Sequence, residues 1–143
     1  MKCSQIRDAI LACRMTKKPL LIWGHTGMSK ATLVEQVAKE NNWGYIQFML
    51  SQVESSGLPQ EKLPRYGEGI LFLDEINRAS HGALQAVFRL IEPEEHTTET
   101  YVLPPGWSVV AAANYENDSY MTSRFSDPIF LSRFRHITMD SKE

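Results

Sequence analysis

The stretch that decides the fold is PLLIWGHTGMSKAT, which covers residues 19–32. Residues 19–23 form a short apolar run that ends at Gly24, a pattern typical of a buried parallel strand. From Lys30 onward, apolar side chains recur on one side of a helical repeat, which predicts a helix over 30–40. The stretch therefore predicts a strand, a glycine-containing loop and a helix in direct succession.

The loop between this strand and this helix resembles the phosphate-binding template G-x-x-x-x-G-K-[ST]. In that template, backbone N–H groups and the helix N-terminus surround the phosphates, the lysine reaches the outer phosphates, and the hydroxyl binds Mg²⁺. Gly24 and Lys30 fit, whereas Ser29 stands in place of the second glycine and Ala31 in place of the hydroxyl. The alternative is an ordinary glycine-containing turn with a solvated lysine. The candidate nucleotide-binding residues are Gly24, His25, Thr26, Gly27, Met28, Ser29, Lys30, Ala31 and Thr32.

The rest of the chain continues the alternation of helical and extended segments. Such an alternation indicates a parallel α/β sheet with right-handed crossovers. The patterns predict helices over 4–15 and 80–92, strands over 45–50, 70–73, 108–113 and 135–139, a long loop over 51–69, a hairpin-like piece around 101–103, and a short helical or irregular stretch over 119–133.

A second group of candidate residues follows the strand predicted over 70–73. Asp74 and Glu75 come directly after this apolar run, and the carboxyl ends of parallel strands are where ligands bind in such sheets. Asp74 is a candidate ligand of Mg²⁺, and Glu75 is a candidate to polarise an attacking water molecule. An acidic pair that caps the next helix is the structural alternative, and the two interpretations are compatible.

Composition limits the remaining possibilities. The 143 residues are 43% hydrophobic and 22% charged, which is typical of a globular protein, and the length predicts one domain over 1–143. The net charge of −2 does not indicate a broad basic surface, so we do not expect a nucleic-acid partner. No apolar run approaches the roughly 18 residues of a membrane span, and the two cysteines form neither a disulfide framework nor a metal pattern. We therefore expect a cytoplasmic protein without membrane contact.

Residues 70–79, ILFLDEINRA, closely resemble the Walker B region of the MoxR-type AAA+ ATPases. The resemblance continues along most of the chain. Residues 108–114 look like the strand that carries the family's sensor 1 residue, residues 92–106 resemble the hairpin inserted before it, and residues 131–134, LSRF, are similar to the motif that ends the core.

The resemblance implies a three-layer P-loop NTPase core of the AAA+ type with a parallel sheet of about five strands. It implies ATP and Mg²⁺ as cofactors, with Asp74 on the metal, Glu75 orienting water, Asn114 sensing the γ-phosphate and Arg133 reaching the nucleotide of a neighbouring subunit. It further implies a homo-oligomeric ring, a hexamer in the family, that uses ATP hydrolysis to remodel or activate a partner protein.

The sequence also departs from the family pattern. Thr26, Ser29 and Ala31 differ from the family's loop, which predicts weakened hydrolysis. The chain ends at Glu143, before the helical lid that normally follows the core, so we expect either a fragment or a minimal form. Two alternatives remain open: a scaffold whose assembly, and not its turnover, is the activity, and a DNA-associated AAA+ motor.

Overall fold

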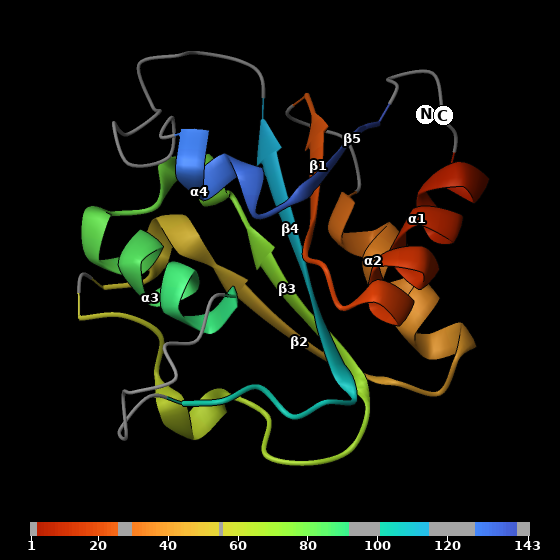
Figure 1. Cartoon of the computed structure of the whole chain (residues 1–143), viewed down its shortest axis with the longest axis horizontal. Coiled ribbons are helices and arrows are strands. Elements are labelled where there is room, and N and C mark those ends of the chain that lie inside the picture. The colour runs from red at the N-terminus through yellow and green to blue at the C-terminus, as the bar shows by residue number, and fades with distance from the viewer. Residues whose placement is uncertain (1–2, 26–29, 55, 92–100, 115–127, 140–143) are drawn as a thin grey trace.

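The computed structural model describes residues 3–25, 30–54, 56–91, 101–114 and 128–139 (Figure 1). Within these ranges, five strands form one sheet, accompanied by four α-helices and three short 3₁₀ helices. In chain order these elements are α1 Cys3–Thr16, β1 Leu20–Gly24, α2 Lys30–Glu40, β2 Gly44–Met49, η1 Leu50–Gln52, η2 Gln60–Lys62, β3 Gly69–Asp74, η3 Ile76–Arg78, α3 His81–Ile91, β4 Trp107–Asn114, α4 Pro128–Ser132 and β5 Arg135–Thr138.

All the strand pairs of this sheet are parallel, in the order β2-β3-β4-β1-β5. The three central strands are mostly buried, because each is an apolar run in which polar side chains stand only near the ends. In the ladder between β1 and β4, Gly24 is paired with Asn114. The polar residues that follow these strands are thereby gathered at one edge of the sheet.

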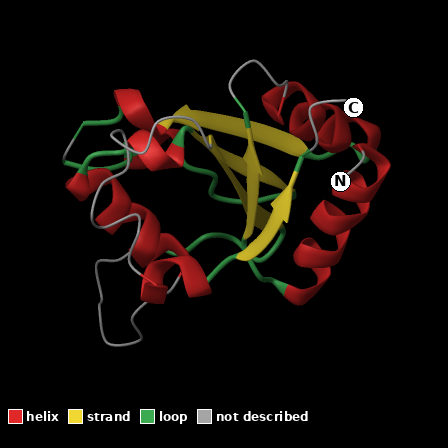
Figure 2. Ribbon diagram, turned by 90° about the horizontal axis from the view of Figure 1, so that it is seen from above, coloured by secondary structure: helices red, strands yellow, loops and turns green. Residues whose placement is uncertain are grey.

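Helices cover both faces of the sheet, so the fold has three layers (Figure 2). The α1 and α2 helices pack on one face, and α3, η3 and α4 pack on the other (Figure 1). Side chains of β4 alternate between the two cores: Val110 and Ala112 face α1 and α2, while Ala111 and Ala113 face α3. The central strand thus contributes small side chains to both interfaces.

The fold class predicted from the sequence is confirmed, including the five parallel strands. The boundaries of the strands and of α1, α2 and α3 differ from the predicted ones by at most one residue, and the predicted long loop over 51–69 contains part of η1 and all of η2. Residues 101–103 form no strand, so the hairpin-like structure predicted around them is wrong for these described residues. Residues 92–100 and 119–127, which belong to the predicted hairpin and irregular stretch, lie outside the described residues. Within the described ranges, no helix has the length and apolar character needed to cross a membrane.

Substitution of Gly69 by alanine tests the packing at the amino end of β3. An added Cβ would lie 2.5 Å from Cη2 of Trp107 and 2.6 Å from the carbonyl oxygen of Gly44, which belongs to the neighbouring strand. We expect a loss of about 2 kcal/mol in the free energy of unfolding, measured in urea, because neither a backbone oxygen nor a packed ring can easily move away. Tyr66→Ala is the control, since this side chain is 85% exposed and its loss should cost less than about 0.5 kcal/mol. Equal effects of the two substitutions would contradict the expected overpacking.

Candidate functional site

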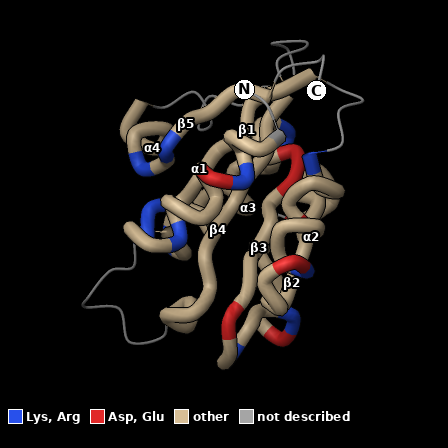
Figure 3. Tube along the Cα trace, turned by 90° about the vertical axis from the view of Figure 1, so that its right-hand side faces the viewer, with Lys and Arg blue, Asp and Glu red and all other residues tan. Residues whose placement is uncertain are grey.

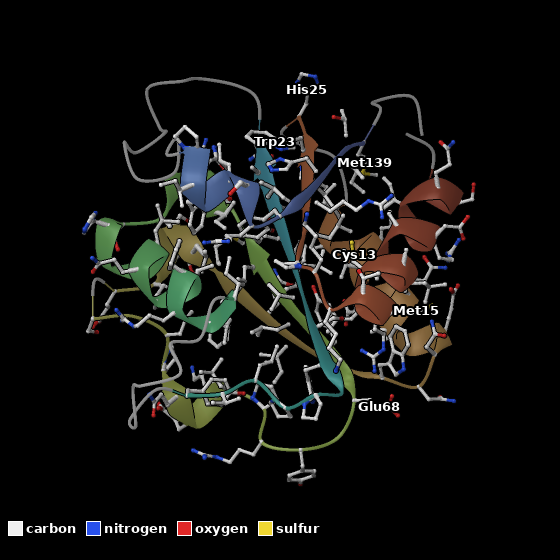
Figure 4. All side chains as sticks on the ribbon, in the orientation of Figure 1. Cys13, Met15, Trp23, His25, Glu68 and Met139 are labelled. Atoms are coloured by element: carbon white, nitrogen blue, oxygen red, sulfur yellow. The ribbon has the colours of Figure 1, made fainter. Side chains whose placement is uncertain are left out.

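The carboxyl ends of three adjacent strands bring the predicted site residues together. Gly24 ends β1, Asn114 ends β4 and Asp74 ends β3, and these strands are neighbours in the sheet. His25 follows β1, and its side chain is directed away from the sheet at this end (Figure 4). Ligands bind at this end of open α/β sheets, because strand-end loops and helix N-termini converge there. We therefore treat this edge as the candidate site.

Lys30 is the first residue of α2 and the best-buried charged side chain among the described residues, with 5% of its surface exposed. Its ammonium Nζ donates hydrogen bonds to Oδ1 of Asn114 at 3.0 Å and to the carbonyl oxygen of His25 at 3.3 Å. The lysine is therefore not the solvated side chain of an ordinary turn. A fixed positive charge lies at a helix N-terminus, where the helix dipole has the same sign.

The other predicted loop residues are only partly described. Ala31 is half-buried and Thr32 is exposed, both in the first turn of α2. Thr26, Gly27, Met28 and Ser29 lie outside the described residues, so their predicted contact with phosphates stays a prediction.

Asn77 holds Asn114 from the opposite layer of the fold. Its Nδ2 donates to the carbonyl oxygen of Asn114 at 3.4 Å, and its Oδ1 accepts from the backbone N–H of Asn114 at 3.3 Å. Only 1% of Asn77 is exposed. Sequence reasoning missed this residue, although a polar side chain three residues after the strand, between the apolar Ile76 and Ala79, was an available signal.

We expect Asn77→Ala to lower the free energy of unfolding by about 2 kcal/mol, because two half-buried backbone groups of Asn114 lose the partner that the buried Asn77 side chain supplies. Urea unfolding followed by circular dichroism measures the change. Asn41→Ala is the matched control: Nδ2 of Asn41 also donates to a backbone oxygen, that of Val37, but on an exposed residue. A loss no larger than that of the control would mean that Asn77 does not support Asn114.

Asp74 and Glu75 occupy two different environments. One oxygen of the Asp74 carboxylate, Oδ1, accepts the backbone N–H of Glu75 at 2.9 Å. Burial raises the pKa of Asp74 above its usual value, while that hydrogen bond and the charge of Lys30 lower it in part. Glu75 has a left-handed backbone with φ of 54°, and its Oε1 accepts a hydrogen bond of 2.5 Å from the Ser51 hydroxyl. Non-glycine residues in this conformation are costly and concentrate at functional sites.

Neither carboxylate caps the next helix through its side chain in the described contacts. At the start of α3, the Ser80 hydroxyl accepts the backbone N–H of Ala83 at 3.1 Å, and Glu75, which precedes η3, makes no side-chain cap. The capping alternative considered for this acidic pair is therefore wrong. Ser51, like Asn77, was missed, because it lies 24 residues away from its partner in the sequence.

The raised pKa of Asp74 predicts how its replacement acts on stability. A carboxyl group whose pKa rises on folding contributes stability at pH values below its ordinary pKa, and that contribution is lost as the pH rises through the raised value. At neutral pH we therefore expect Asp74→Asn to be more stable than the wild type, and this advantage should shrink in acid. Urea unfolding at neutral and acidic pH measures both free energies. A variant less stable than the wild type at neutral pH would contradict the proposed cost of burying this charge.

Arg133 lies in the turn between α4 and β5, and it is exposed. Its backbone N–H donates to the carbonyl oxygen of Phe130 at 3.2 Å. The α4 helix anchors this turn, since Phe130 and Phe134 are buried and pack against each other with ring centroids 5.4 Å apart. The structure thus places an exposed arginine on a well-packed support, and its predicted reach toward another subunit stays a prediction.

Comparison with known proteins supports the class of this fold. No profile of a known protein family matches the sequence. The chain is 30% identical over 112 residues to the replication factor C large subunit of Thermofilum pendens, which corresponds to 69% of this chain and 24% of that protein. It superposes on a candidate ATPase from Cytophaga hutchinsonii with a TM-score of 0.72 and 18% identity, covering 96% of this chain and 46% of the other. It also superposes on the RuvB Holliday junction branch migration motor of Thermotoga maritima with a TM-score of 0.63 and 21% identity, covering 96% of this chain and 44% of the other.

The sheet, its order and its strand-end residues therefore define a P-loop NTPase fold. The solved structures named above share this fold, which is that of the AAA+ P-loop NTPases. The chain spans less than half the length of these solved structures and about a quarter of the curated relative.

Proposed function

We propose that this chain is the ATP-binding core of an AAA+ ATPase of the MoxR type. The observation that carries the proposal is the contact of Lys30 with Asn114, which joins the helix after the predicted phosphate loop to the predicted sensor 1 residue. An arrangement that serves only stability has no need to bury an ammonium group at a helix N-terminus, because desolvation of a charge is costly. A phosphate group provides the negative charge that this lysine suits.

The described residues fit a nucleotide with Mg²⁺. Lys30 would hold the outer phosphates, and Asp74 would hold the metal, either directly or through water. Within the described ranges, no three His, Cys, Asp or Glu residues gather into a metal-binding group. Mg²⁺ would therefore take most of its ligands from phosphate oxygens and water, as it usually does. The bound metal would neutralise charge that develops on the phosphates.

The residues around the metal ligand supply the roles needed for hydrolysis. Glu75 would take the proton of a water molecule that attacks the terminal phosphorus, and its carboxylate must then exchange the Ser51 hydroxyl for that water. Asn114, held by Asn77, would contact the terminal phosphate. Arg133 would complete the site of the next subunit in a homo-oligomeric ring, in which hydrolysis remodels or activates a partner protein in the cytoplasm.

The departures at Ser29 and Ala31 favour weak hydrolysis, and with it the alternative of a scaffold that ATP assembles but that turns over little. Ala31 offers no hydroxyl to Mg²⁺, and the neighbouring Thr32 points about 100° away around the helix. Calorimetric titration with ATP, with and without Mg²⁺, together with a phosphate-release assay, tests the proposal. ATP binding with slow release supports an ATPase, binding without release supports the scaffold, and absence of binding contradicts both.

A DNA-associated motor is the second candidate function. The names of the curated relative, a replication factor C subunit, and of the RuvB branch migration motor favour it, and they weaken the expectation that nucleic acid is not a partner. Basic and acidic residues are interspersed along the described trace in Figure 3, so the charge pattern does not add support. Titration of duplex DNA at increasing salt concentration separates the candidates, because phosphate contacts give affinity that falls steeply with salt.

A further inference from the structure

His136, in β5, joins two parts of the chain that the proposed mechanism leaves unconnected. Its Nδ1 accepts a hydrogen bond from the indole Nε1–H of Trp23 at 2.9 Å, and its Nε2 lies 2.7 Å from the carbonyl oxygen of Leu131 in α4. The planes of the imidazole and indole rings are inclined by only 16°, with centroids 6.2 Å apart, so the two rings lie nearly coplanar, as a hydrogen bond between ring nitrogens requires. Trp23 lies near the carboxyl end of β1, on the side of the sheet that α4 covers (Figure 4).

The two partners fix the protonation state of this imidazole. An indole N–H can only donate a hydrogen bond, so Nδ1 must carry a lone pair. A carbonyl oxygen can only accept, so Nε2 must carry the proton. The ring is therefore the neutral Nε2–H tautomer. Among the ordinary side chains, only histidine accepts and donates hydrogen bonds from two nitrogen atoms of one rigid ring in this way.

The two hydrogen-bond partners of His136 both lie close in the sequence to proposed site residues. Trp23 immediately precedes Gly24, where the predicted phosphate loop begins, and Leu131 is two residues before Arg133. The main chains of β1 and β5 are already joined by their ladder, and Met139 N–H donates to the carbonyl oxygen of Trp23 at 2.7 Å. The register of the strands therefore does not depend on the imidazole. What the imidazole adds is a connection from the side chain before the loop to the α4 turn.

We propose that His136 is a positioning residue that couples the carboxyl end of β1, at Trp23 and Gly24, to the α4 turn bearing Arg133, so that nucleotide bound next to Gly24 alters the position of Arg133. This inference rests on the proposed function, because it needs nucleotide at the loop. His136 is exposed, so its replacement removes the link without opening the core. A movement of Gly24 and Trp23 toward bound phosphates would pull on the ring, and the ring would transmit the displacement to the carbonyl of Leu131.

The test uses the complete 143-residue chain labelled with ¹⁵N and the variants His136→Phe and Trp23→Phe. His136→Phe keeps an aromatic ring but removes both hydrogen bonds of the imidazole, and Trp23→Phe keeps a ring but removes the bond from the indole N–H. Arg135→Gln is the matched control, because it changes an exposed neighbour on the opposite face of the same strand. In the free protein, the Trp23 Nε1–H resonance should move upfield in His136→Phe and stay in place in Arg135→Gln. An unchanged resonance in His136→Phe overturns the proposed contact.

Titration with Mg-ATP then tests the coupling. In the wild type and in Arg135→Gln, backbone amides at both Lys30 and Arg133 should shift. In His136→Phe and Trp23→Phe the shift at Arg133 should fall to less than about half, with the shift at Lys30 retained and the ATP affinity within about threefold. Shifts at Arg133 that equal those of the wild type overturn the coupling while leaving nucleotide binding intact. Absence of any shift at Lys30 in the wild type overturns the proposed function, and the coupling with it.

Discussion

Replacement of Lys30 by alanine is expected to weaken ATP binding by about 10- to 100-fold, because a charge-assisted hydrogen bond contributes about 1.5–3 kcal/mol. The lysine is already held by Asn114 and His25, so little side-chain freedom remains to be lost when phosphate binds. Its removal should therefore cost nearly the full interaction. Calorimetric titration of ATP into the wild type and the variant measures the two dissociation constants.

Lys39→Ala provides the control for this substitution. Lys39 belongs to the same helix, α2, but is exposed in its last turn, so its loss should change the ATP affinity little. Circular dichroism of both variants shows whether the helix is retained. Equal affinities of the folded Lys30→Ala variant and the wild type would remove Lys30 from the nucleotide site and take away the main support of the proposed function.

A second large effect is expected for Glu75→Gln, which should lower ATP turnover by about 10²- to 10⁴-fold and leave ATP binding nearly unchanged. The amide keeps the shape of the side chain and still accepts the Ser51 hydroxyl, but it cannot take a proton from water. Phosphate release at saturating Mg-ATP and high protein concentration measures the rate, so that a slow wild-type reaction is still detected.

Glu61→Gln is the control for the loss of one carboxylate, because Glu61 lies in η2 and is exposed. Its turnover should equal that of the wild type. A turnover of Glu75→Gln that also equals the wild type would exclude Glu75 as the base. Loss of turnover together with loss of ATP binding would instead indicate a structural role of Glu75.

Much of the sheet could be predicted because its strands are continuous apolar runs. The runs after residues 19, 69 and 107 are buried over most of their length, so burial and sequence agree on the boundaries within one or two residues. The polar residue that ends each run therefore marks the carboxyl end of a strand, where the candidate site lies. The apolar runs are therefore enough to place Asp74 and Asn114 at strand ends.

The residues that support the site could not be predicted in the same way. Asn77 and Ser51, each in a short 3₁₀ helix, bond to residues 37 and 24 positions away, and no periodic pattern encodes a contact over such a distance in the sequence. The burial of Lys30 could not be predicted either, because the sequence does not show that the side-chain amide of Asn114 accepts a hydrogen bond from this lysine. The predicted roles of Glu75, Asn114 and Arg133 stay predictions until the substitutions are made.

The group of AAA+ proteins to which the chain belongs could not be predicted from the sequence either. The Walker B and sensor 1 segments resemble the MoxR group, whereas the curated relative is a replication factor C subunit and RuvB is among the solved structures with this fold. In the proposed function these segments surround the nucleotide, so they reflect the chemistry of ATP and not the choice of a partner. A fold does not by itself specify a function, so these segments indicate the AAA+ fold better than they indicate a partner.

The alanines of β4 set the distance between the two helical layers at the site. Asn114 is bonded by Lys30 from one layer and by Asn77 from the other, so both layers must come within hydrogen-bonding distance of one residue. The residues just before it, Ala111, Ala112 and Ala113, present only methyl groups to the two cores. These methyl groups act as spacers, and a valine or leucine there would widen the gap between the layers. Asn114 would then be within reach of Lys30 or of Asn77, but no longer of both.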